Sequence, residues 1–449
     1  MTNKLILIAA LSAAFPLATL AQPQGQPSGP YHVERIQLIG GEGGFDYVTA
    51  DPDGRTLFVA RSGPEGHIGV FNLDTLTEVG DIPNTSAHGA AVDTATGHGF
   101  ATSKPVTMFD AKTFAVIKKI DVEGNPDGYL NDPYNHHFYV LSHSEPNITV
   151  IDDKDGTILG TIDIGGAPEQ AATDGHGRIY VDIVNKAAIA VIDANTMKMV
   201  TTYDLSSRGS GCAGLALDAK NGILFAACRE KNNMVILSAA DGHIITDLPI
   251  GVGCDGASFN PETMEAFTSQ GDGTLTVVKE NSPTDFAVEQ TVLTPARAKT
   301  HTLDTKTGKI YLITAEFGPQ PAEAAQPAGA ATQAGSPRPG GAPVQGGPPP
   351  FWRRNWAPMI PHSFQIVVVG KERGADQIWL FSQVAGRAGY SLQKWPLRSA
   401  DPSALRCSPS CTCGLADGGR CFHRSFSSRA ELRYSEARSS PMRTTLKRH

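Results

Sequence analysis

The sequence predicts an all-β fold, a seven-bladed β-propeller whose last blade is closed by the N-terminal strand. Three observations favour it. A unit of about forty residues recurs seven times, each unit holds short β-rich runs separated by turns, and the first run of the chain resembles the last run of the other units. The β-branched, turn-rich composition excludes the helical solenoids that share this period.

An Asp or Asn that opens a turn marks the period in every unit. Such a side chain accepts a hydrogen bond from the backbone two residues on, and the Gly of "DPDG", "DAKNG" or "DTKTG" is expected to supply the positive φ that follows. The seven anchor residues, separated by steps of 42, 39, 42, 44, 42 and 44, are Asp51, Asp93, Asp132, Asp174, Asp218, Asn260 and Asp304.

The strands follow from the anchors. Each turn joins two short alternating runs, a third run such as "IAVIDA" follows, and a polar turn leads to a fourth such as "TILGTIDIG". The seventh unit lacks a fourth run, whereas "YHVERIQLIGG" (31–41) has the pattern of one. We therefore expect a propeller over residues 31–371 in which the first strand pairs with an otherwise exposed edge of the last blade.

Two segments carry a resemblance to a known family: "FYVLSHSEPNITVIDDKDGTILGTIDIGGAPEQAATD" and "IYVDIVNKAAIAVIDANTMKMV". Each has a Tyr-Val strand, a short polar gap, a "V-I-D" strand and an outer strand. This arrangement resembles the YVTN-repeat (YncE-like) β-propeller family, over roughly residues 31–370. The resemblance implies the fold, but such rings serve as binding proteins, scaffolds and enzymes alike.

The N-terminus has the features of a secretory signal peptide over residues 1–21. Lys4 precedes an apolar run that Pro16 interrupts, and small residues lead to an expected cleavage after Ala21. No later segment has 18 uninterrupted apolar residues, so no membrane span is expected. The sequence thus predicts an exported protein, periplasmic or secreted.

Two further segments do not fit blades. Residues 318–363 form a Pro/Gly-rich insertion and loop between the second strand of the seventh blade and a third strand at 364–371. Its aromatic part, "FWRRNWAPMIPHS", either packs on the rim of the propeller or binds a partner. Residues 372–449 form a non-propeller tail, read as disordered or out of frame, whose four Cys and His423 match no zinc-binding spacing.

The charge of the chain limits the kinds of partner that it is expected to bind. The chain has a formal charge of −7, and its basic residues are concentrated in the tail, so the propeller itself is more acidic. An acidic surface argues against nucleic acid as a partner, because phosphate binding needs basic residues. We expect a monomer that binds an unidentified small ligand or protein partner, with no cofactor apart from a divalent cation that the acidic residues would tolerate.

The candidate binding residues come from the same period. In a propeller, the first strand of each blade lines the central channel, and the residue five positions before each anchor should face one mouth. Six of these seven positions are ionisable: Asp46, His88, Asp127, Glu169, Asp255 and Lys299, with Ala213 in the fifth unit. His301 lies on the same face as Lys299, and Arg61 and Gln270 end their second strands near this mouth. The predicted ligand-binding set is Asp46, Arg61, His88, Asp127, Glu169, Asp255, Lys299 and His301.

This ring suits a cation, a metal ion or a small hydroxylated ligand, and crowded carboxylates should raise one another's pKa. The alternative is that it is merely solvated surface. A second hypothesis is a lyase or hydrolase in which His88 and His301 act as acid and base or hold a divalent ion. The sequence assigns no residue a catalytic role.

Three of the seven cysteines fall within the propeller. Cys212 and Cys254 occupy equivalent positions on neighbouring first strands, while Cys228 ends the strand that pairs with the one starting at Cys212. Cys212–Cys228 and Cys212–Cys254 disulfides and free buried thiols all remain open. Covalent-haem, phosphate-loop, zinc-protease and serine-hydrolase motifs are absent from the sequence.

Overall fold

The computed structural model describes residues 29–319 and 357–372, and every regular element within them is a β-strand. Clustering of contacts divides the chain into Met1–Trp379 and Leu380–His449, and the second unit lies wholly outside the described residues. So do the expected signal peptide, residues 320–356 of the insertion and the tail from 373. The part that the structure describes holds no helix long and apolar enough to cross a bilayer.

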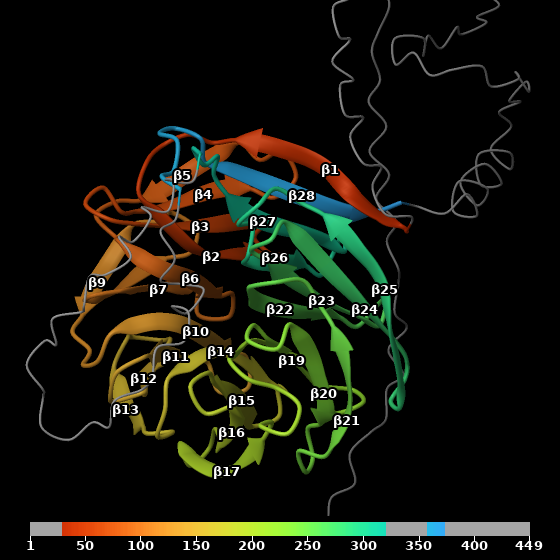
Figure 1. Ribbon diagram of the computed structural model, residues 1–449. Helices are drawn as coiled ribbons and strands as arrows, with labels where there is room; N and C mark the ends of the chain where they lie inside the picture. The colour runs from red at the N-terminus through yellow and green to blue at the C-terminus, as the bar shows by residue number, and fades with distance from the viewer. Residues whose placement is uncertain (1–28, 320–356, 373–449) are drawn as a thin grey trace, which may run out of the picture. The chain divides into compact units, whose positions relative to one another are not determined.

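Seven four-stranded antiparallel sheets surround a central channel (Figure 1). Blade one consists of β2 (Gly44–Asp51), β3 (Thr56–Ser62), β4 (Ile68–Asn72) and β5 (Glu78–Ile82). Blade two consists of β6 (Ala87–Asp93), β7 (His98–Ser103), β8 (Val106–Asp110) and β9 (Val116–Ile120). Blade three consists of β10 (Pro126–Asp132), β11 (His137–Ser142), β12 (Ile148–Asp152) and β13 (Ile158–Ile162).

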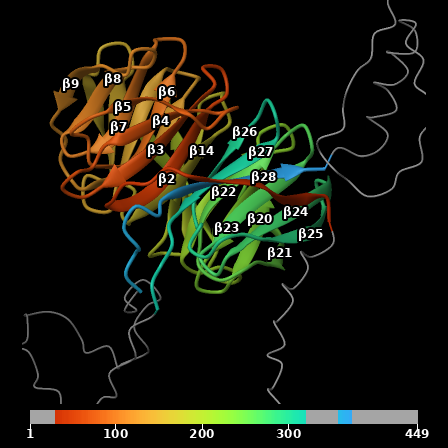
Figure 2. The ribbon, with the colours of Figure 1, turned by 90° about the horizontal axis from the view of Figure 1, so that it is seen from above.

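The next three blades repeat this order. Blade four consists of β14 (Pro168–Thr173), β15 (Arg178–Ile183), β16 (Ala188–Asp193) and β17 (Lys198–Asp204). Blade five consists of β18 (Cys212–Asp218), β19 (Ile223–Cys228), β20 (Asn233–Ser238) and β21 (Ile244–Pro249). Blade six consists of β22 (Cys254–Asn260), β23 (Glu265–Gln270), β24 (Thr274–Ser282) and β25 (Asp285–Leu293). In every blade the first strand faces the channel and contacts the first strands of its neighbours (Figures 1 and 2).

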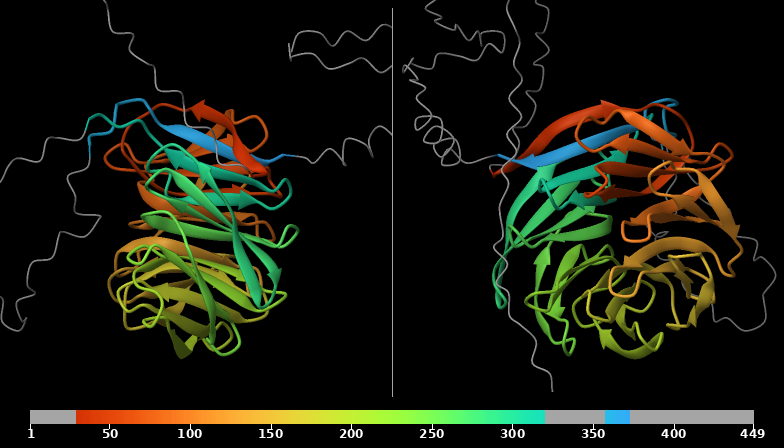
Figure 3. Two further views of the ribbon diagram at one scale, coloured as in Figure 1. Left: turned by 45° about the vertical axis from the view of Figure 1, so that its right-hand side comes forward. Right: turned by 180° about the vertical axis from the view of Figure 1, so that it is seen from behind.

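Blade seven is closed by the N-terminal strand, as predicted. Its order is β26 (His301–Asp304), β27 (Lys309–Thr314), β28 (Gln365–Lys371) and β1 (Tyr31–Leu38). Tyr31 pairs with Lys371 and Leu38 with Gln365, so the two ends of the ring lie side by side (Figure 3). The Tyr31 hydroxyl also donates to Glu265 of blade six, at 2.5 Å, which ties the closing strand to the neighbouring blade.

The anchor residues form the turns that the period predicts. The side chains of all seven anchors accept a hydrogen bond from the backbone N–H two residues on, as Asp218 does from Lys220 and Asp304 from Lys306. Gly222 and Gly308 have the expected positive φ. The expectation fails at "DPDG", where Arg55 and not Gly54 has the positive φ of 56°. In the turns after Asp51, Asp218 and Asp304 the left-handed residue comes four positions after the anchor, whereas Gly54 comes three positions after Asp51.

The core lies between blades and not within a single central layer. Seven clusters of buried apolar side chains fill the seven interfaces between neighbouring blades of the described region. Phe100 of blade two, for example, stacks on Phe138 of blade three with ring centroids 5.0 Å apart. Because every blade is packed on both faces, the first strands are held firmly at the channel, where aromatic packing stabilises the ring beyond simple burial of area.

Candidate functional site at the mouth of the central channel

A β-bulge lies at the same place in six blades and aims one side chain of each toward the channel mouth. The pairing between first and second strands shifts register between Phe45 and Val48 in blade one, and equivalent shifts occur in blades two to six. Bulges bend a strand and redirect its side chains, and they are enriched beside functional sites. The residues at these shifts are Asp46, His88, Asp127, Glu169, Ala213 and Asp255.

Around this mouth, eight side chains form a closed chain of alternating acids and bases, which we call the channel-mouth ring. Six come from the starts of blades one, two, three, four, six and seven, and two come from the ends of second strands. In order around the channel they are Asp46, His88, Asp127, His143, Glu169, Arg229, Asp255 and Lys299. Every acid in the ring therefore contacts two bases.

The distances show how close the groups lie. His88 Nδ1 is 2.9 Å from Asp46 Oδ2 and 3.1 Å from Asp127 Oδ1. His143 Nε2 is 3.1 Å from Asp127 Oδ2 and 3.3 Å from Glu169 Oε2. Arg229 lies 3.3 Å from Glu169 and 2.8 Å from Asp255. Lys299 contacts Asp255 directly and lies 3.7 Å from Asp46.

Six of the eight predicted site residues lie in this ring, and two do not. The Arg61 guanidinium donates to the carbonyls of Gly40 and Glu42 and stacks on Phe364, 3.5 Å from the ring centroid. His301 lies below the ring, with its imidazole between two serines. Sequence reasoning missed His143 and Arg229, which directly follow β11 and β19 and complete the ring.

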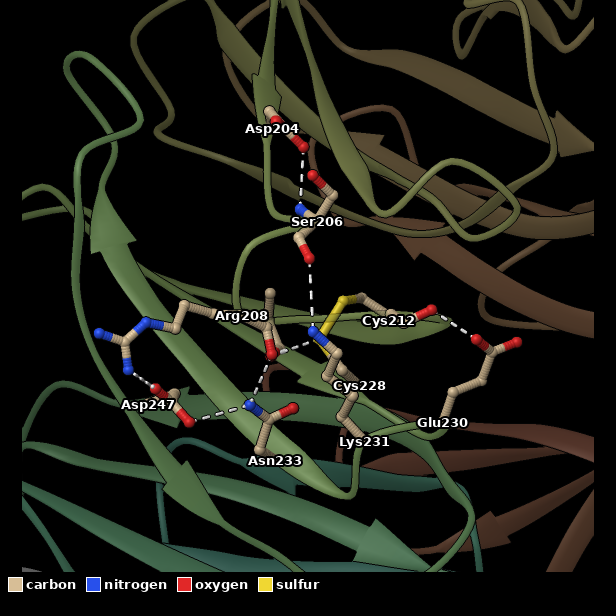
Figure 4. Close-up of a disulfide and its surroundings, with 11 residues drawn as sticks. Asp204, Ser206, Arg208, Cys212, Cys228, Glu230, Lys231, Asn233 and Asp247 are labelled. Atoms are coloured by element: carbon tan, nitrogen blue, oxygen red, sulfur yellow. Dashed lines mark hydrogen bonds and ion pairs between the residues drawn. A yellow bond between two sulfur atoms is a disulfide. The ribbon is translucent and has the colours of Figure 1, made fainter.

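Arg229 occupies the place that blade five would otherwise leave without a charge. The fifth blade has the small Ala213 at its ring position, so a long side chain from the end of β19 can reach between Glu169 and Asp255. The disulfide Cys212–Cys228 joins the start of β18 to the residue before Arg229 (Figure 4). Cys254 is a free, buried cysteine. Of the alternatives that the sequence left open, the structure therefore shows Cys212–Cys228.

Polar contacts surround the disulfide and fix the loop that leads into β18. Asn233 Nδ2 donates to the carbonyl of Arg208 at 3.0 Å and to Asp247 at 3.1 Å, and Arg208 also pairs with Asp247 at 2.8 Å (Figure 4). The covalent link and these bonds hold the β18–β19 hairpin in one register at the mouth. The position of Arg229 in the ring follows from that register.

The ring is uneven in exposure. The side chains of His88 and His143 are 41% and 39% exposed, whereas that of Asp255 is 5% exposed. The two imidazoles are thus the groups that an incoming molecule meets, and the carboxylates lie behind them. Gly128, next to Asp127, permits this close packing, because a Cβ there would lie 2.3 Å from the carbonyl oxygen of Glu169.

Proton affinities in the ring follow from burial and from the partners. A hydrogen bond to Glu169 and the charge of Asp127 raise the pKa of His143 to about 8. A hydrogen bond to Asp46 raises the pKa of His88 as well. Burial, with the charges of Asp46 and Glu169, raises the pKa of Asp127 to about 6, although both imidazoles act in the opposite direction. Burial would lower the pKa of Lys299, but Asp255 and Asp46 outweigh it and keep the ammonium protonated.

Below the ring, polar side chains connect neighbouring blades and line a cavity. The Tyr47 hydroxyl lies 3.4 Å from the carbonyl of Glu169, and Gln170 bridges blades four to six through bonds with Leu215 and Ala257. A cavity of about 670 Å³ continues beneath them to the turns at the opposite end, lined in part by Tyr129, Ser258 and His301. Because Glu169 also lines this cavity, the ring lies at one end of it.

His301 is a neutral imidazole held by two serines. Ser269 Oγ lies 2.6 Å from the carbonyl of Lys299, which can only accept, so the serine donates there and accepts from His301 Nδ1 at 2.8 Å. This leaves Nε2 as an acceptor for the Ser258 hydroxyl, also at 2.8 Å. Burial lowers the pKa of His301 to about 4, consistent with an uncharged imidazole.

Among the described residues, two groups of side chains have the composition and spacing of a metal site. Asp46, His88 and Asp127 form one, and Asp127, His143 and Glu169 form the other, each with ligand atoms within 4.8 Å of one another. The two groups share Asp127, which presents one carboxylate oxygen to each imidazole. Chemically, the ring can hold a cation, accept hydrogen bonds from a polar ligand, or exchange protons with it.

Comparison with known proteins agrees with the fold and leaves the activity open. No protein-family model matches the chain. Among solved structures, one chain of the "Crystal Structure of Mitotic Checkpoint Complex" superposes with a TM-score of 0.54 at 12% identity, over 69% of this chain and 95% of that chain. At this identity the likeness shows the propeller fold alone.

Two curated relatives are each called "Uncharacterized protein YncE", one from Salmonella typhi and one from Salmonella typhimurium (strain LT2). Both are 23% identical over 194 residues, which is 41% of this chain. The match spans about half, 54%, of the length of these relatives. The chain is therefore a distant homologue of YncE, built as a seven-bladed β-propeller.

Proposed function

We propose that the chain is a binding protein that recognises a small polar ligand at the channel-mouth ring. The observation that carries the proposal is the closed alternation of four carboxylates with four basic side chains, two of them imidazoles exposed to solvent. Such a set is rigidly placed by seven packed blades, so binding would need little rearrangement. Rigid placement lowers the entropic cost of binding.

Charge indicates which ligands suit the ring. When both imidazoles are neutral, the four carboxylates outnumber the two permanent cations, Arg229 and Lys299. A cationic or hydroxyl-bearing ligand that takes the place of the imidazole protons then fits better than an anion. Hydroxyl and ammonium groups donate hydrogen bonds that carboxylates accept. A macromolecular partner that presents a Lys or Arg at this mouth is the competing occupant.

A thermal-shift screen of the full chain tests the proposal. The compounds are polyols, sugars, amines and amino acids, each titrated with and without EDTA, since a ligand that binds only the native state must raise the apparent midpoint in a concentration-dependent way. Asp127→Asn and His88→Ala should abolish the shift. His136→Ala is the matched control, because this imidazole also pairs with a carboxylate, Asp93 at 3.1 Å, but lies outside the ring.

A shift that survives both ring substitutions would place binding elsewhere and contradict the proposal. No shift with any compound would favour a protein partner over a small ligand. In that case, pull-down with wild-type and Asp127→Asn protein would have to show a difference between the two for the ring to remain the binding site.

A second candidate is acid–base catalysis, as in a lyase or hydrolase. The sequence suggests His88 and His301 for this role, but both nitrogens of His301 are occupied by serines. The observation in favour is that His88 and His143 both contact Asp127. Groups with pKa values near neutrality are suited to proton transfer. Turnover of a ligand found in the screen, lost in His143→Ala, would support it.

Location and assembly complete the proposal. The N-terminal pattern supports export to the periplasm or medium, and the Cys212–Cys228 disulfide suits an oxidising compartment. We propose a monomer, which light scattering of the purified chain would check. Cell fractionation, with the protein in the periplasm or medium and residues 1–21 removed, would support export.

A further inference from the structure

We propose that Asp46, His88 and Asp127 bind one divalent transition-metal ion at the channel mouth. The inference rests on the proposed function, since it names the first occupant of the ring and thereby the class of ligand that follows. Each residue contributes one atom: Asp46 Oδ2, His88 Nδ1 and Asp127 Oδ1.

The spacing of these atoms fits ligands that share one ion. Ligands about 2.1 Å from an octahedral ion, at right angles to one another, lie about 3.0 Å apart. His88 Nδ1 lies 2.9 Å from the Asp46 oxygen and 3.1 Å from the Asp127 oxygen.

Hydrogen bonding supplies a second, independent observation. Asp127 is only 8% exposed, yet its Oδ1 receives no hydrogen bond from any described residue. His88 Nδ1 carries at most one proton, and that proton bonds to Asp46 at 2.9 Å. A buried carboxylate oxygen without a donor is costly, and such a group calls for an ion or water.

Charge favours a single divalent ion. With neutral imidazoles the ring has four carboxylates against the cations of Arg229 and Lys299, an excess of two negative charges. One divalent ion cancels this excess. Two imidazolium ions would also cancel it, so protons are the competitor that the experiment has to exclude.

The second group of candidate ligands is less suited to a metal. Glu169 Oε2 is bonded by both His143 and Arg229, the latter at 3.3 Å, so this oxygen is already compensated. His143 instead contacts the other oxygen of Asp127, at 3.1 Å. A partner of this kind orients a ligating carboxylate without touching the ion. We therefore assign His143 a positioning role.

The ligand set limits the ion and the molecule that would join it. One imidazole nitrogen with two carboxylate oxygens suits Mn²⁺, Fe²⁺, Co²⁺ or Zn²⁺ better than Ca²⁺, which prefers oxygen ligands alone. Three protein ligands leave coordination positions open toward solvent, on the side where His88 is exposed. An oxygen donor such as a hydroxy acid or a diol could take these positions.

Mn²⁺ is the appropriate probe, because thiolates prefer softer ions and the cysteines outside the propeller would compete little for it. The full chain, without an affinity tag and stripped with EDTA, is titrated with Mn²⁺ at pH 8. The bound ion is followed by loss of the solution EPR signal of free Mn²⁺. We expect one ion per chain. His88→Ala and Asp46→Asn should each weaken binding at least tenfold, and His143→Ala less than either.

His136→Ala is the matched control and should bind Mn²⁺ as the wild type does, because within the described residues its imidazole pairs with a single carboxylate, that of Asp93. Thermal unfolding in EDTA shows whether each variant is folded, and two independent ligand variants guard against one that is not. The proposal is overturned if the wild type binds Mn²⁺ no better than His88→Ala, or if His136→Ala is the variant that loses it.

The outcomes separate this inference from the proposed function. Binding of a polar ligand that persists in EDTA, with no uptake of Mn²⁺, would overturn the metal site and leave the binding protein standing. Uptake of Mn²⁺ at the ring, with no compound in the screen shifting the midpoint with or without the ion, would keep the metal site and count against small-ligand recognition.

Discussion

The two halves of the channel-mouth ring differ in how their negative charge is balanced. In blades four to seven, Glu169 and Asp255 contact Arg229 and Lys299, which are charged at any physiological pH. In blades one to three, Asp46 and Asp127 face two imidazoles, whose charge depends on pH. The first half is a permanent ion-pair network. Within the part that the structure describes, only Asp46 of the second half has a permanent cation nearby, Lys299 at 3.7 Å, and the remaining negative charge is balanced only if a proton or a metal ion is supplied.

This difference indicates in which half of the ring a ligand is expected to bind. A network that is complete in itself contributes stability and rigidity, whereas groups whose compensation varies can respond to a ligand. The imidazoles are also the most exposed members of the ring, while Asp255 is nearly buried. The half with His88 and His143, the histidine half, is therefore the part of the mouth that can respond to a ligand. The half with Arg229 and Lys299, the supporting half, holds it in place.

The largest expected effect is on the supporting half. Lys299→Met leaves the buried Asp255 with one cation, Arg229 at 2.8 Å, in place of two. The expected cost is about 3 kcal/mol, at the low end for breaking a buried pair, because one partner remains. Urea unfolding in EDTA measures the change. Lys306→Met is the control, because Lys306 and Asp53 pair at 2.7 Å with both side chains at least half exposed. A surface pair contributes under about 1 kcal/mol. An equal loss of unfolding free energy in both variants would show that the ring pair is no more important for stability than an exposed pair.

The disulfide supports the same half of the ring. The replacement of both Cys212 and Cys228 by Ser removes a link across 16 residues of sequence, which should cost about 3 kcal/mol. It should also loosen Arg229, the residue that follows Cys228. Hydrogen exchange would show faster exchange in the β18–β19 hairpin than in the β6–β7 hairpin of the histidine half. Unchanged exchange at Arg229 would mean that blade packing alone places it.

Lowering the pH should destabilise the protein through His301, which lies below the ring. Its folded pKa of about 4 is below the ordinary 6.5 or so of an unfolded histidine. Its contribution is thus present above about pH 6.5 and is lost as the pH falls toward 4, by about 2 kcal/mol. Unfolding of wild type and His301→Gln at pH 7 and pH 4.5 measures it. If His301→Gln loses as much unfolding free energy between pH 7 and pH 4.5 as the wild type does, His301 is not a buried neutral imidazole.

The contribution of His143 to stability should have the opposite pH dependence and a smaller magnitude. Its folded pKa of about 8 is raised, so in metal-free protein its contribution is full below about pH 6.5 and lost as the pH rises through 8. Because the side chain is 39% exposed, solvent screening reduces the effect to about 1 kcal/mol. The stability difference between wild type and His143→Asn should shrink between pH 6 and pH 9. A constant difference would indicate packing and not charge.

Much of this architecture could be predicted from one period. The anchors placed every turn, and the position five residues before them placed the six ring residues at the starts of blades, because a repeated unit puts equivalent residues at equivalent places around an axis. Closure by β1 followed from a missing fourth strand. The glycine of "DPDG" predicts the positive φ one residue too early, because in this turn the left-handed conformation falls on Arg55 and not on Gly54.

The missed residues have a pattern of their own. His143 and Arg229 both stand eleven positions after their anchors, Asp132 and Asp218, whereas Arg61 stands ten after Asp51. Side chains alternate along a strand, so a step of one residue turns Arg61 away from the mouth. The small Ala213 was the further signal, because it leaves room for Arg229. Which of the neighbouring carboxylates each base contacts could not be predicted, since it depends on the bulges and on the exact packing of blades.

Anomalous diffraction from crystals of the full chain grown with Mn²⁺, recorded on both sides of the manganese absorption edge, tests the division of the ring most directly. We predict one anomalous peak at the mouth, between His88 Nδ1, Asp46 Oδ2 and Asp127 Oδ1, with Arg229 and Lys299 still bonded to Asp255. A map without a peak there, in which both imidazoles keep their direct contacts with the carboxylates, would contradict a responsive half and reduce the ring to a network of ion pairs.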